Sequence, residues 1–291
     1  MAWSSSHWAS GYSPPRRLCA SLARPRGVLG VPTSSDSIRR CGLPAVASCR
    51  MERLVVSDGT DTATLVATQD HWLLTVDVPR GEAERRQRLL EAAAQALGAE
   101  GGGRIVFWVD NTDEAGDRVP LAAGYTPFRD LWRLGRQLPA IPGSLRTRPF
   151  ADQDRASFLE VNNRAFDWHP EQGGMTEADL ESRMSEPWFD ADGFRIWEND
   201  SGELGGYCWT KVHSDVKPPV GEIYAIAVDP DLRGRGIGRE LTLAGLEWLA
   251  HLGLRRAILY VESDNRPANR MYNELGFERE ATNRAYQRIL R

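Results

Sequence analysis

Three glycines and three arginines share the short segment 233–239, which reads Arg-Gly-Arg-Gly-Ile-Gly-Arg. Glycines at alternate positions let backbone N–H groups converge on an anion, and a helix that begins there adds the partial positive charge of its N-terminus. The segment lacks the Gly-Lys-Ser/Thr ending of a P-loop, and Arg239 stands where a dinucleotide-binding motif has Gly or Ala. We therefore predict a diphosphate-binding loop, with a basic, glycine-rich surface turn as the alternative.

A second group of polar residues follows the apolar segment 259–261. Asn265, Asn269 and Tyr272 can share one face of a helix, because their spacing is close to whole helical turns. We expect this face to point toward the arginine- and glycine-rich loop. The alternative is an ordinary capped helix with a tyrosine in the core.

Glu222 lies within an otherwise apolar segment, 220–228, which is predicted to be a strand. An amine is protonated at neutral pH and must lose a proton before it can attack an electrophile, so a carboxylate in this place could act as a general base. The alternative is a glutamate on an exposed face of the strand.

The cysteines and histidines do not predict a metal site. No Cys-x-x-Cys pair is present, and His169 and His213 have no partners at the spacing of metal ligands. We expect both histidines to be polar side chains with satisfied hydrogen bonds. Cys208 stands alone in an apolar run, which favours a small buried residue over a nucleophile.

The composition excludes several classes of protein. The chain has 291 residues, of which 41% are hydrophobic and 26% charged, and it contains no run of about 18 apolar residues. We therefore expect a globular protein without a membrane span. The net charge is −4, yet residues 1–50 carry seven Arg and a single acid, Asp36, so the remainder is strongly acidic. An acidic body argues against general nucleic-acid binding.

Residues 1–50 are rich in Ser, Arg and Pro and show no sustained periodicity. The composition is compatible with an organellar transit peptide. However, Pro14, Pro15 and scattered glycines interrupt the amphipathic helix that such a peptide needs. We predict a disordered or non-native N-terminal extension, with Met51 as a possible true start.

The remaining sequence contains a degenerate repeat. A shift of 152 positions superimposes apolar runs and a Gly-aromatic pair in two stretches, without gaps. The matched pairs include Val76 with Val228, Leu89 with Leu241, Ile105 with Ala257, and Tyr125 with Phe277. Each copy alternates strand and helix. The predicted fold class is therefore α/β (α+β), with two tandem domains of a mixed central sheet flanked by helices.

The two copies differ at the predicted phosphate loop. Glu82, Glu84 and Arg86 replace the three glycines of the second copy, and carboxylates there would repel a phosphate. The first copy also lacks the first part of the second, so it is predicted to be truncated. We predict an extension at 1–50, a degenerate domain at 51–138, a linker at 139–145 and a catalytic domain at 146–291.

The local pattern of the second copy predicts the elements around the candidate residues. Thr176 and Asp179 form a capping-box pattern at the start of a helix. A hairpin is expected at 194–199 and 206–213, followed by the strand 220–228. A helix with its apolar face at positions 241–252, a strand at 257–261, a helix at 268–275 and a final strand at 278–290 complete the copy.

With these motifs in place, the sequence resembles the GNAT superfamily, the Gcn5-related N-acetyltransferases, and more narrowly the tandem-GNAT mycothiol synthase family. The loop 228–238 and the series Asn265, Ala268, Tyr272 and Gly276-Phe277 match the superfamily's acetyl-CoA signature. The narrower resemblance is carried by Val161–Phe166, the segment 169–176, Trp188–Asp190, Cys208–His213, Gly221–Tyr224 and Leu259–Asn265. It covers residues 145–291 closely and 51–138 loosely.

The resemblance implies transfer of acetyl from acetyl-CoA to the cysteinyl amine of a cysteine–glucosamine–inositol pseudodisaccharide, with no metal. It implies Glu222 as general base and Tyr272 as proton donor to the departing thiolate. The implied substrate-binding residues are Glu171, Lys211, Glu222 and Tyr260. The implied acetyl-CoA-binding residues are Ile226, Ala227, Val228, Arg233, Gly234, Arg235, Gly236, Ile237, Gly238, Arg239, Asn265, Arg266, Pro267, Ala268, Asn269 and Arg270.

Two other functions remain open at this point: a GNAT enzyme acting on another small amine or a protein N-terminus, and a non-catalytic acetyl-CoA-binding protein. We expect a cytoplasmic monomer whose partners are small molecules and include no nucleic acid and no membrane. No residue of the first copy matches the acidic contact that the family's N-terminal domain makes with its substrate.

Overall fold

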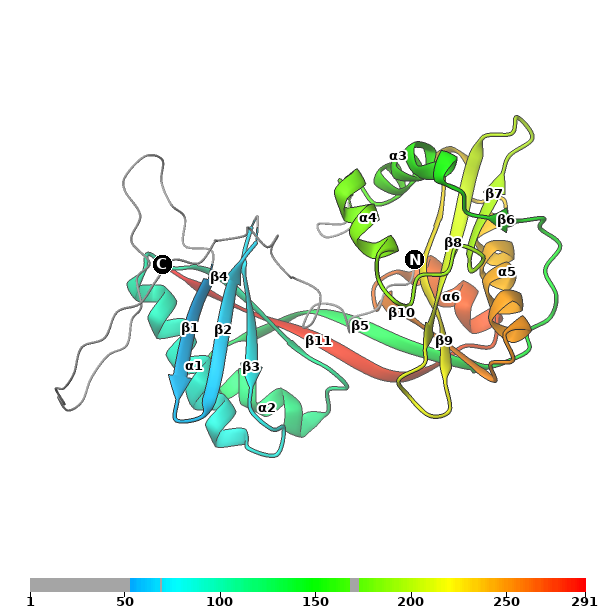
Figure 1. Cartoon of the computed structure of the whole chain (residues 1–291). Coiled ribbons are helices and arrows are strands. Elements are labelled where there is room, and N and C mark those ends of the chain that lie inside the picture. Colours follow the sequence, from blue (N-terminus) through cyan, green and yellow to red (C-terminus); the bar gives the residue numbers. More distant parts are fainter. Residues whose placement is uncertain (1–52, 69, 168–172) are drawn as a thin grey trace, which may run out of the picture.

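The chain forms two α/β halves joined by one continuous sheet (Figure 1). A computed structural model of the whole chain describes residues 53–68, 70–167 and 173–291. The first half contains β1 (Arg53–Asp58), β2 (Asp61–Ala67), β3 (Trp72–Asp77), α1 (Ala83–Ala99), β4 (Gly103–Val109), α2 (Glu114–Ala122) and β5 (Thr126–Gln137).

The second half repeats this order after four additional elements. It begins with β6 (Arg148–Pro149), a 3-10 turn η2 (Asp152–Asp154), α3 (Arg155–Ala165) and α4 (Glu177–Met184). The repeated part is β7 (Phe194–Glu198), β8 (Leu204–His213), β9 (Val220–Val228), the 3-10 turn η3 (Pro230–Leu232), α5 (Ile237–His251), β10 (Arg256–Glu262), α6 (Arg266–Glu274) and β11 (Glu278–Leu290). The predicted tandem α/β architecture is confirmed, since α2 begins at Glu114 and α6 begins 152 positions later at Arg266.

The two halves exchange their last strands. The sheet order is β1-β2-β3-β4-β11-β5-β10-β9-β8-β7-β6, so β11 pairs with β4 of the first half and β5 pairs with β10 of the second. Between these neighbours, β5 and β11 pair with each other in antiparallel fashion. Figure 1 shows the two strands running side by side from one half to the other. Repeat periodicity did not predict this exchange, because consecutive elements usually pair within their own unit.

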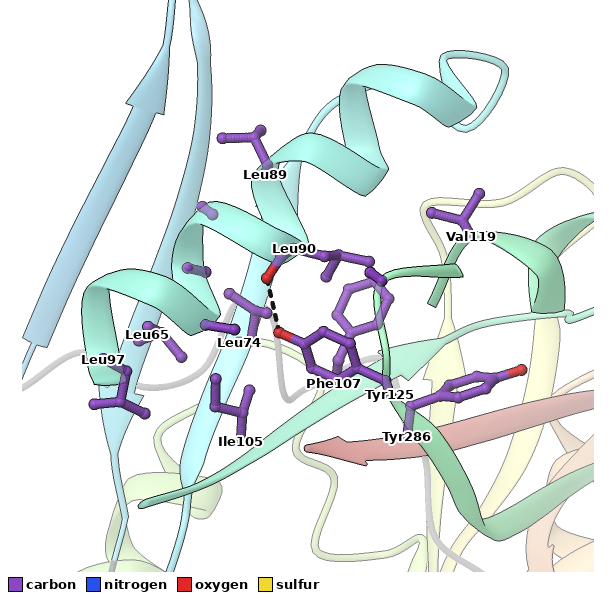
Figure 2. Packing of buried hydrophobic residues seen from close by; sticks show 14 of the residues in the cluster. Leu65, Leu74, Leu89, Leu90, Leu97, Ile105, Phe107, Val119, Tyr125 and Tyr286 are labelled. Atoms are coloured by element: carbon purple, nitrogen blue, oxygen red, sulfur yellow. Dashed lines mark hydrogen bonds between the residues drawn. The ribbon is translucent and has the colours of Figure 1, made fainter. Parts of the chain in front are cut away.

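The core of the first half shows the consequence of the exchange. Leu89, Leu90 and Leu97 of α1 point toward the sheet, where they meet residues of β2, β3 and β4 (Figure 2). Tyr286 of β11, fully buried, belongs to the same cluster although it comes from the second half. Each large apolar side chain buried in this way contributes about 1.5–3 kcal/mol. Each half therefore depends on a strand of the other.

Helices cover both faces of the sheet in the second half. The predicted apolar face of α5 packs on the sheet through Leu241 and Leu249, but Leu252 at the end of the helix is 44% exposed. On the opposite face, Phe158 of α3 stacks edge-on against Phe194 of β7, with ring centroids 5.1 Å apart. The two-sided cover explains why β9 is almost continuously buried.

The first half has an arginine at the position of the third glycine of the predicted phosphate loop. Arg86 occupies the position that corresponds to Gly238, and its Nη1 donates to the carbonyl oxygen of Val78 at 2.7 Å. Its guanidinium lies 6.0 Å from the centroid of the Phe107 ring. An arginine side chain with its own contacts thus stands where the second half has a glycine, in addition to the carboxylates of Glu82 and Glu84.

No helix within the described ranges is long and apolar enough to cross a membrane.

The exchange predicts that the second half will not fold properly alone. A fragment 139–291 lacks β4 and β5, so one edge of β10 and both edges of β11 lose their strand partners. We expect it to aggregate or to unfold without a cooperative transition in thermal circular dichroism, and the fragment 51–138 to restore a soluble complex when co-expressed. A monomeric 139–291 fragment that melts cooperatively at the Tm of the parent would contradict the interdependence of the halves.

Candidate active site

The candidate site lies where two neighbouring parallel strands stop pairing. Strand β10 pairs with β9 over three residue pairs only, which end at Leu259 and Ile223, while β9 continues to Val228. On its other side, β9 remains paired with β8 as far as Val228. The main chain of β9 near Val228 is therefore not used by β10 and can receive a ligand group.

The loop after β9 has the conformation that its glycines suggested. Gly234 and Gly236 have φ values of +80° and +79°, in the left-handed region that other residues adopt only with strain. Gly236 is the N-cap of α5, which begins at Ile237. The loop and the first turn of α5 together present main-chain N–H groups and the positive end of a helix, the usual surroundings of a bound diphosphate.

Ion pairs hold this loop against α3. Arg164 donates to Asp229 and Asp231, with both contacts at 2.7 Å. Arg233 donates from Nη2 to the carbonyl oxygen of Ala165 at 2.9 Å. Because these contacts engage the loop from the side of α3, they fix the direction in which α5 leaves β9.

The other two arginines of the loop differ in their surroundings. Arg235 is exposed, whereas Arg239 contacts Glu240 at 3.0 Å. Glu240 also accepts hydrogen bonds from the main-chain N–H and the hydroxyl of Ser144, at 2.6 and 2.8 Å, and these hydrogen bonds together with Arg239 lower the pKa of the Glu240 carboxyl. The connection between the two halves is thus attached to the first turn of α5.

Glu222 is fully buried in the middle of β9. In the strand register it lies opposite Lys211 of β8 and Ile258 of β10. Its Oε2 is 2.5 Å from Nε2 of His213, while its Oε1 has no hydrogen-bond partner among the described residues. A buried carboxylate oxygen without a donor is costly unless a ligand supplies one.

Lys211 brings a buried positive charge to the same face of the sheet. Only 5% of the residue is exposed, and Nζ lies 4.7 Å from the ring centroid of Trp188 and 5.8 Å from that of Tyr224. Burial lowers the pKa of Lys211, and the negative charge of Glu222 opposes this effect. Tyr260 of β10 is also largely buried and lies opposite Arg133 of the exchanged strand β5.

Helix α6 contributes two buried polar atoms that have no partner among the described residues. Asn269 donates from Nδ2 to the carbonyl oxygens of Glu262 and Ser263, at 3.0 and 3.2 Å, and its Oδ1 is buried without a described partner. The hydroxyl of Tyr272 is likewise buried and without a described partner, and burial raises the pKa of this phenol. Asn265 caps α6 by accepting from the N–H of Ala268.

The sheet separates these groups into two sets. Tyr272 belongs to the core between the sheet and the helices α5 and α6, together with Ile223 and Leu259. Because neighbouring residues of a strand point to opposite faces, Glu222 lies on the other face. The end of the β9–β10 pairing at Ile223 and Leu259 is the place where a ligand could reach both sets.

Comparison with known proteins identifies the family. The model of the Acetyltransferase (GNAT) family matches residues 158–277. The mycothiol acetyltransferase of Mycobacteroides abscessus is 37% identical over 88% of this chain and 92% of its own length, and that of Nocardia farcinica is 36% identical over 90% and 89%. The chain belongs to the mycothiol acetyltransferase family. It is a GNAT acetyltransferase by its sequence and by its fold.

Solved structures agree on the fold of this GNAT chain. A GCN5-related N-acetyltransferase from Sphaerobacter thermophilus superimposes with a TM-score of 0.64 at 19% identity, over 79% of this chain and 77% of that chain. A tandem GNAT protein from the clavulanic acid biosynthesis pathway gives 0.57 at 19% identity, over 81% and 82%. Both likenesses extend beyond the second half and support the tandem arrangement.

The structure of this family member gathers most of the predicted site residues. Glu222, Lys211 and Tyr260 lie on adjacent strands, and the predicted acetyl-CoA-binding residues follow the end of β9, the loop, the start of α5 and the start of α6. Glu171 and His169 lie outside the described residues. Within those ranges, no group of three or more His, Cys, Asp or Glu is placed to hold a metal ion.

Sequence reasoning missed the contact of His213 with Glu222. The sequence predicted a polar side chain with satisfied hydrogen bonds, which this contact confirms, but it did not identify the partner. The available signal was the alternation of β8, because Lys211 and His213 are two positions apart and thus share a face. Pairing that face with Glu222 required the strand register.

Cys208 is buried as the sequence predicted, so its thiol should be protected from alkylation. The thiol is fully buried, burial raises its pKa to about 12, and a Cβ added at Gly245 would meet its Sγ at 2.4 Å. We expect no alkylation of Cys208 by iodoacetamide at pH 8 in the native protein, measured by peptide mass spectrometry, and full alkylation in denaturant.

The same thiol should contribute to the pH dependence of stability. Because its folded pKa exceeds the value of about 8.5 in an unfolded chain, its contribution is complete below pH ~8.5 and decreases up to about pH 12. A Cys208→Ala variant should lose less stability than the parent over this range. Rapid native alkylation of Cys208 would contradict its burial.

Proposed function

We propose that this chain transfers the acetyl group of acetyl-CoA to the cysteinyl amine of a cysteine–glucosamine–inositol pseudodisaccharide and so forms mycothiol. The observation that carries the proposal is the buried carboxylate of Glu222, whose Oε1 has no described partner, at the point where β9 and β10 stop pairing. The names and coverage of the relatives support the acceptor.

The acetyl-CoA diphosphate would be held by the loop between β9 and α5. Left-handed glycines, the N-terminus of α5 and the exposed Arg235 provide the donors and the charge that a diphosphate requires. Farther along the cofactor, Asn269 Oδ1 and the Tyr272 hydroxyl are buried groups that need partners. The proposed binding residues are Ile226, Ala227, Val228, Arg233, Gly234, Arg235, Gly236, Ile237, Gly238, Arg239, Asn265, Arg266, Pro267, Ala268, Asn269 and Arg270.

Glu222 would serve as the general base. The acceptor amine is a cation at neutral pH, and its N–H can donate to the free Oε1 of Glu222. Transfer of that proton to the carboxylate, directly or through water, leaves a neutral amine whose lone pair forms the new C–N bond. The C–S bond of the thioester then breaks, and its electron pair leaves with the sulfur of CoA. The nitrogen, which is cationic after the attack, loses its second proton to solvent as the amide forms, and Glu222 later releases its proton to solvent as well.

Two groups would stabilise the charges that develop. Negative charge on the thioester oxygen can be met by the main-chain N–H groups of β9 near Val228, which β10 does not use. The departing thiolate can accept the phenolic proton of Tyr272. Because burial raises the pKa of Tyr272, this residue remains a neutral phenol and therefore a donor at physiological pH. The phenolate is reprotonated afterwards from solvent.

The acceptor would lie on the face that Glu222 shares with Lys211 and Tyr260. A polyol needs several hydrogen bonds, and the ammonium of Lys211 carries three donors. The desolvation of Lys211 strengthens its interactions, since nearby water does not screen them. We also assign Glu171 to this contact, from the family resemblance alone.

The proposed function is tested by the acceptor assay combined with Glu222→Gln. We expect the parent to acetylate the pseudodisaccharide, and Glu222→Gln to lower kcat by about 10²- to 10⁴-fold because the base is lost. The Kd for acetyl-CoA from calorimetry should stay close to that of the parent. Glu247→Gln, which changes an exposed acid of α5, is the matched control and should keep parental rates.

Other results would favour other functions. Turnover of peptides or other amines without turnover of the pseudodisaccharide would reject the proposed acceptor while keeping the acetyltransferase chemistry. Binding of acetyl-CoA without turnover of any amine, unchanged in Glu222→Gln, would indicate a non-catalytic acetyl-CoA-binding protein.

A change at Gly238 separates acetyl-CoA binding from folding. A Cβ at Gly238 would lie 3.8 Å from both Met271 Sδ and Val228 Cγ2, an ordinary packing distance. Since Ala favours a helix over Gly by about 0.8–1.0 kcal/mol, Gly238→Ala should equal or exceed the parental Tm. We expect it to weaken acetyl-CoA binding by about tenfold or more, because the methyl group obstructs close approach of the diphosphate.

Gly98→Ala provides the matched control for this measurement. Gly98 lies in α1 of the first half, and a Cβ there meets nothing within 4 Å. It should gain a similar amount of stability and bind acetyl-CoA with the parental Kd in calorimetry. Parental affinity in a folded Gly238→Ala protein would argue against diphosphate binding at this loop.

A further inference from the structure

His213 and Glu222 form a histidine–carboxylate pair within the second half. His213 is the last residue of β8, and Glu222 lies on β9 on the far side of the hairpin that joins the two strands. Nε2 of the imidazole is 2.5 Å from Oε2 of the carboxylate. An ionised carboxylate can only accept hydrogen bonds, so this contact requires the imidazole proton to be on Nε2.

The two partners differ in exposure. The side chain of Glu222 is 0% exposed, whereas that of His213 is 18% exposed and precedes the exposed segment 214–219. The contact uses Oε2 and leaves Oε1 as the carboxylate oxygen without a described partner. One oxygen is thus held by a protein donor, and the other is left for a ligand.

Other charged groups surround the pair on the same face. Lys211, opposite Glu222 in the register, has its pKa lowered by burial, while Glu222, Glu186 and Asp215 act in the opposite direction. Tyr224, the next buried titratable group along β9, has its pKa raised to about 12 by burial and is neutral at physiological pH. Among the described residues, His213 is the one that hydrogen-bonds to the Glu222 carboxylate.

We propose that His213 is a positioning residue for acetyl transfer, which holds the Glu222 carboxylate oriented with Oε1 toward the acceptor amine. This inference rests on the proposed function, in which Glu222 receives the proton of that amine. The imidazole does not touch the reacting atoms. Its Nε2–H compensates the burial of the carboxylate and fixes its rotamer, as hydrogen-bonded partners of ligand side chains do in other sites.

Two substitutions at His213 separate positioning from structural support. His213→Leu removes the donor, and His213→Gln keeps a neutral N–H donor at a similar reach. We expect kcat for the pseudodisaccharide to fall about 10- to 100-fold in His213→Leu, and to return to within about threefold of the parent in His213→Gln. Acetyl-CoA binding, measured by calorimetry, should remain parental in both.

The pH profile of kcat/KM distinguishes positioning from structural support, because loss of a purely structural contact would leave this profile unchanged. A buried carboxylate without its donor is protonated more readily. The acidic limb of kcat/KM in His213→Leu should therefore move to higher pH by about one unit, and that of His213→Gln should move less. If His213→Leu is insoluble, His213→Ser removes the ring without adding apolar bulk and carries the same expectations.

The first half offers a matched control. His71 also contacts a carboxylate, with Nδ1 2.8 Å from Oδ1 of Asp70, but it belongs to the degenerate copy. His71→Gln should keep the parental kcat and pH profile.

Three results would overturn the inference. A folded His213→Leu protein with parental kcat and pH profile would show that Glu222 needs no such donor. Equal losses in His213→Leu and His213→Gln would show that a donor at this place is not what matters. Absence of turnover in the parent itself would instead reject the proposed function, and this inference with it.

Discussion

The site depends on the early end of the pairing between β9 and β10. The two strands share three residue pairs, whereas β10 and the exchanged strand β5 share seven. Strand β10 is therefore held mainly by β5, and β9 mainly by β8. This division lets β9 and β10 separate beyond Ile223 without either losing its place in the sheet. The degenerate half has Arg86 in place of a glycine of the phosphate loop. It nevertheless supports the site, because its strand β5 pairs with β10 of the second half.

The electrostatics of the site follow from the same arrangement. A sheet covered by helices on both faces excludes water, so charges within it interact strongly and need partners. Lys211 of β8 lies opposite Glu222 of β9 in the strand register, and His213 contacts Oε2 of the Glu222 carboxylate. On the helix side, Tyr272 and Asn269 carry polar atoms without described partners. Unmet hydrogen-bonding capacity therefore lies on both sides of the point where the strands separate, which suits a site that binds two substrates.

Local pattern predicted the elements well, and long-range pairing poorly. The β9 boundaries at Val220 and Val228, and the capping box of Thr176 and Asp179, were predicted from short-range signals and are confirmed. The exchange of β5 and β11 was not, because strand periodicity gives the faces of a strand and not its neighbours. The contact of His213 with Glu222 was missed for the same reason, since it depends on the β8–β9 register. Glu171 lies outside the described residues, and its role stays a prediction.

If the separation of β9 from β10 brings the thioester of acetyl-CoA to the carboxylate of Glu222, both substrates must meet at the end of the β9–β10 pairing. A crystal structure of the Glu222→Gln protein with acetyl-CoA and the pseudodisaccharide tests this most directly, because the slow variant preserves both substrates. We predict that the thioester oxygen accepts a hydrogen bond from the main chain of β9 near Val228, with the acceptor amine beside residue 222. A thioester located away from the end of the β9–β10 pairing, with the amine beyond reach of residue 222, would contradict the account.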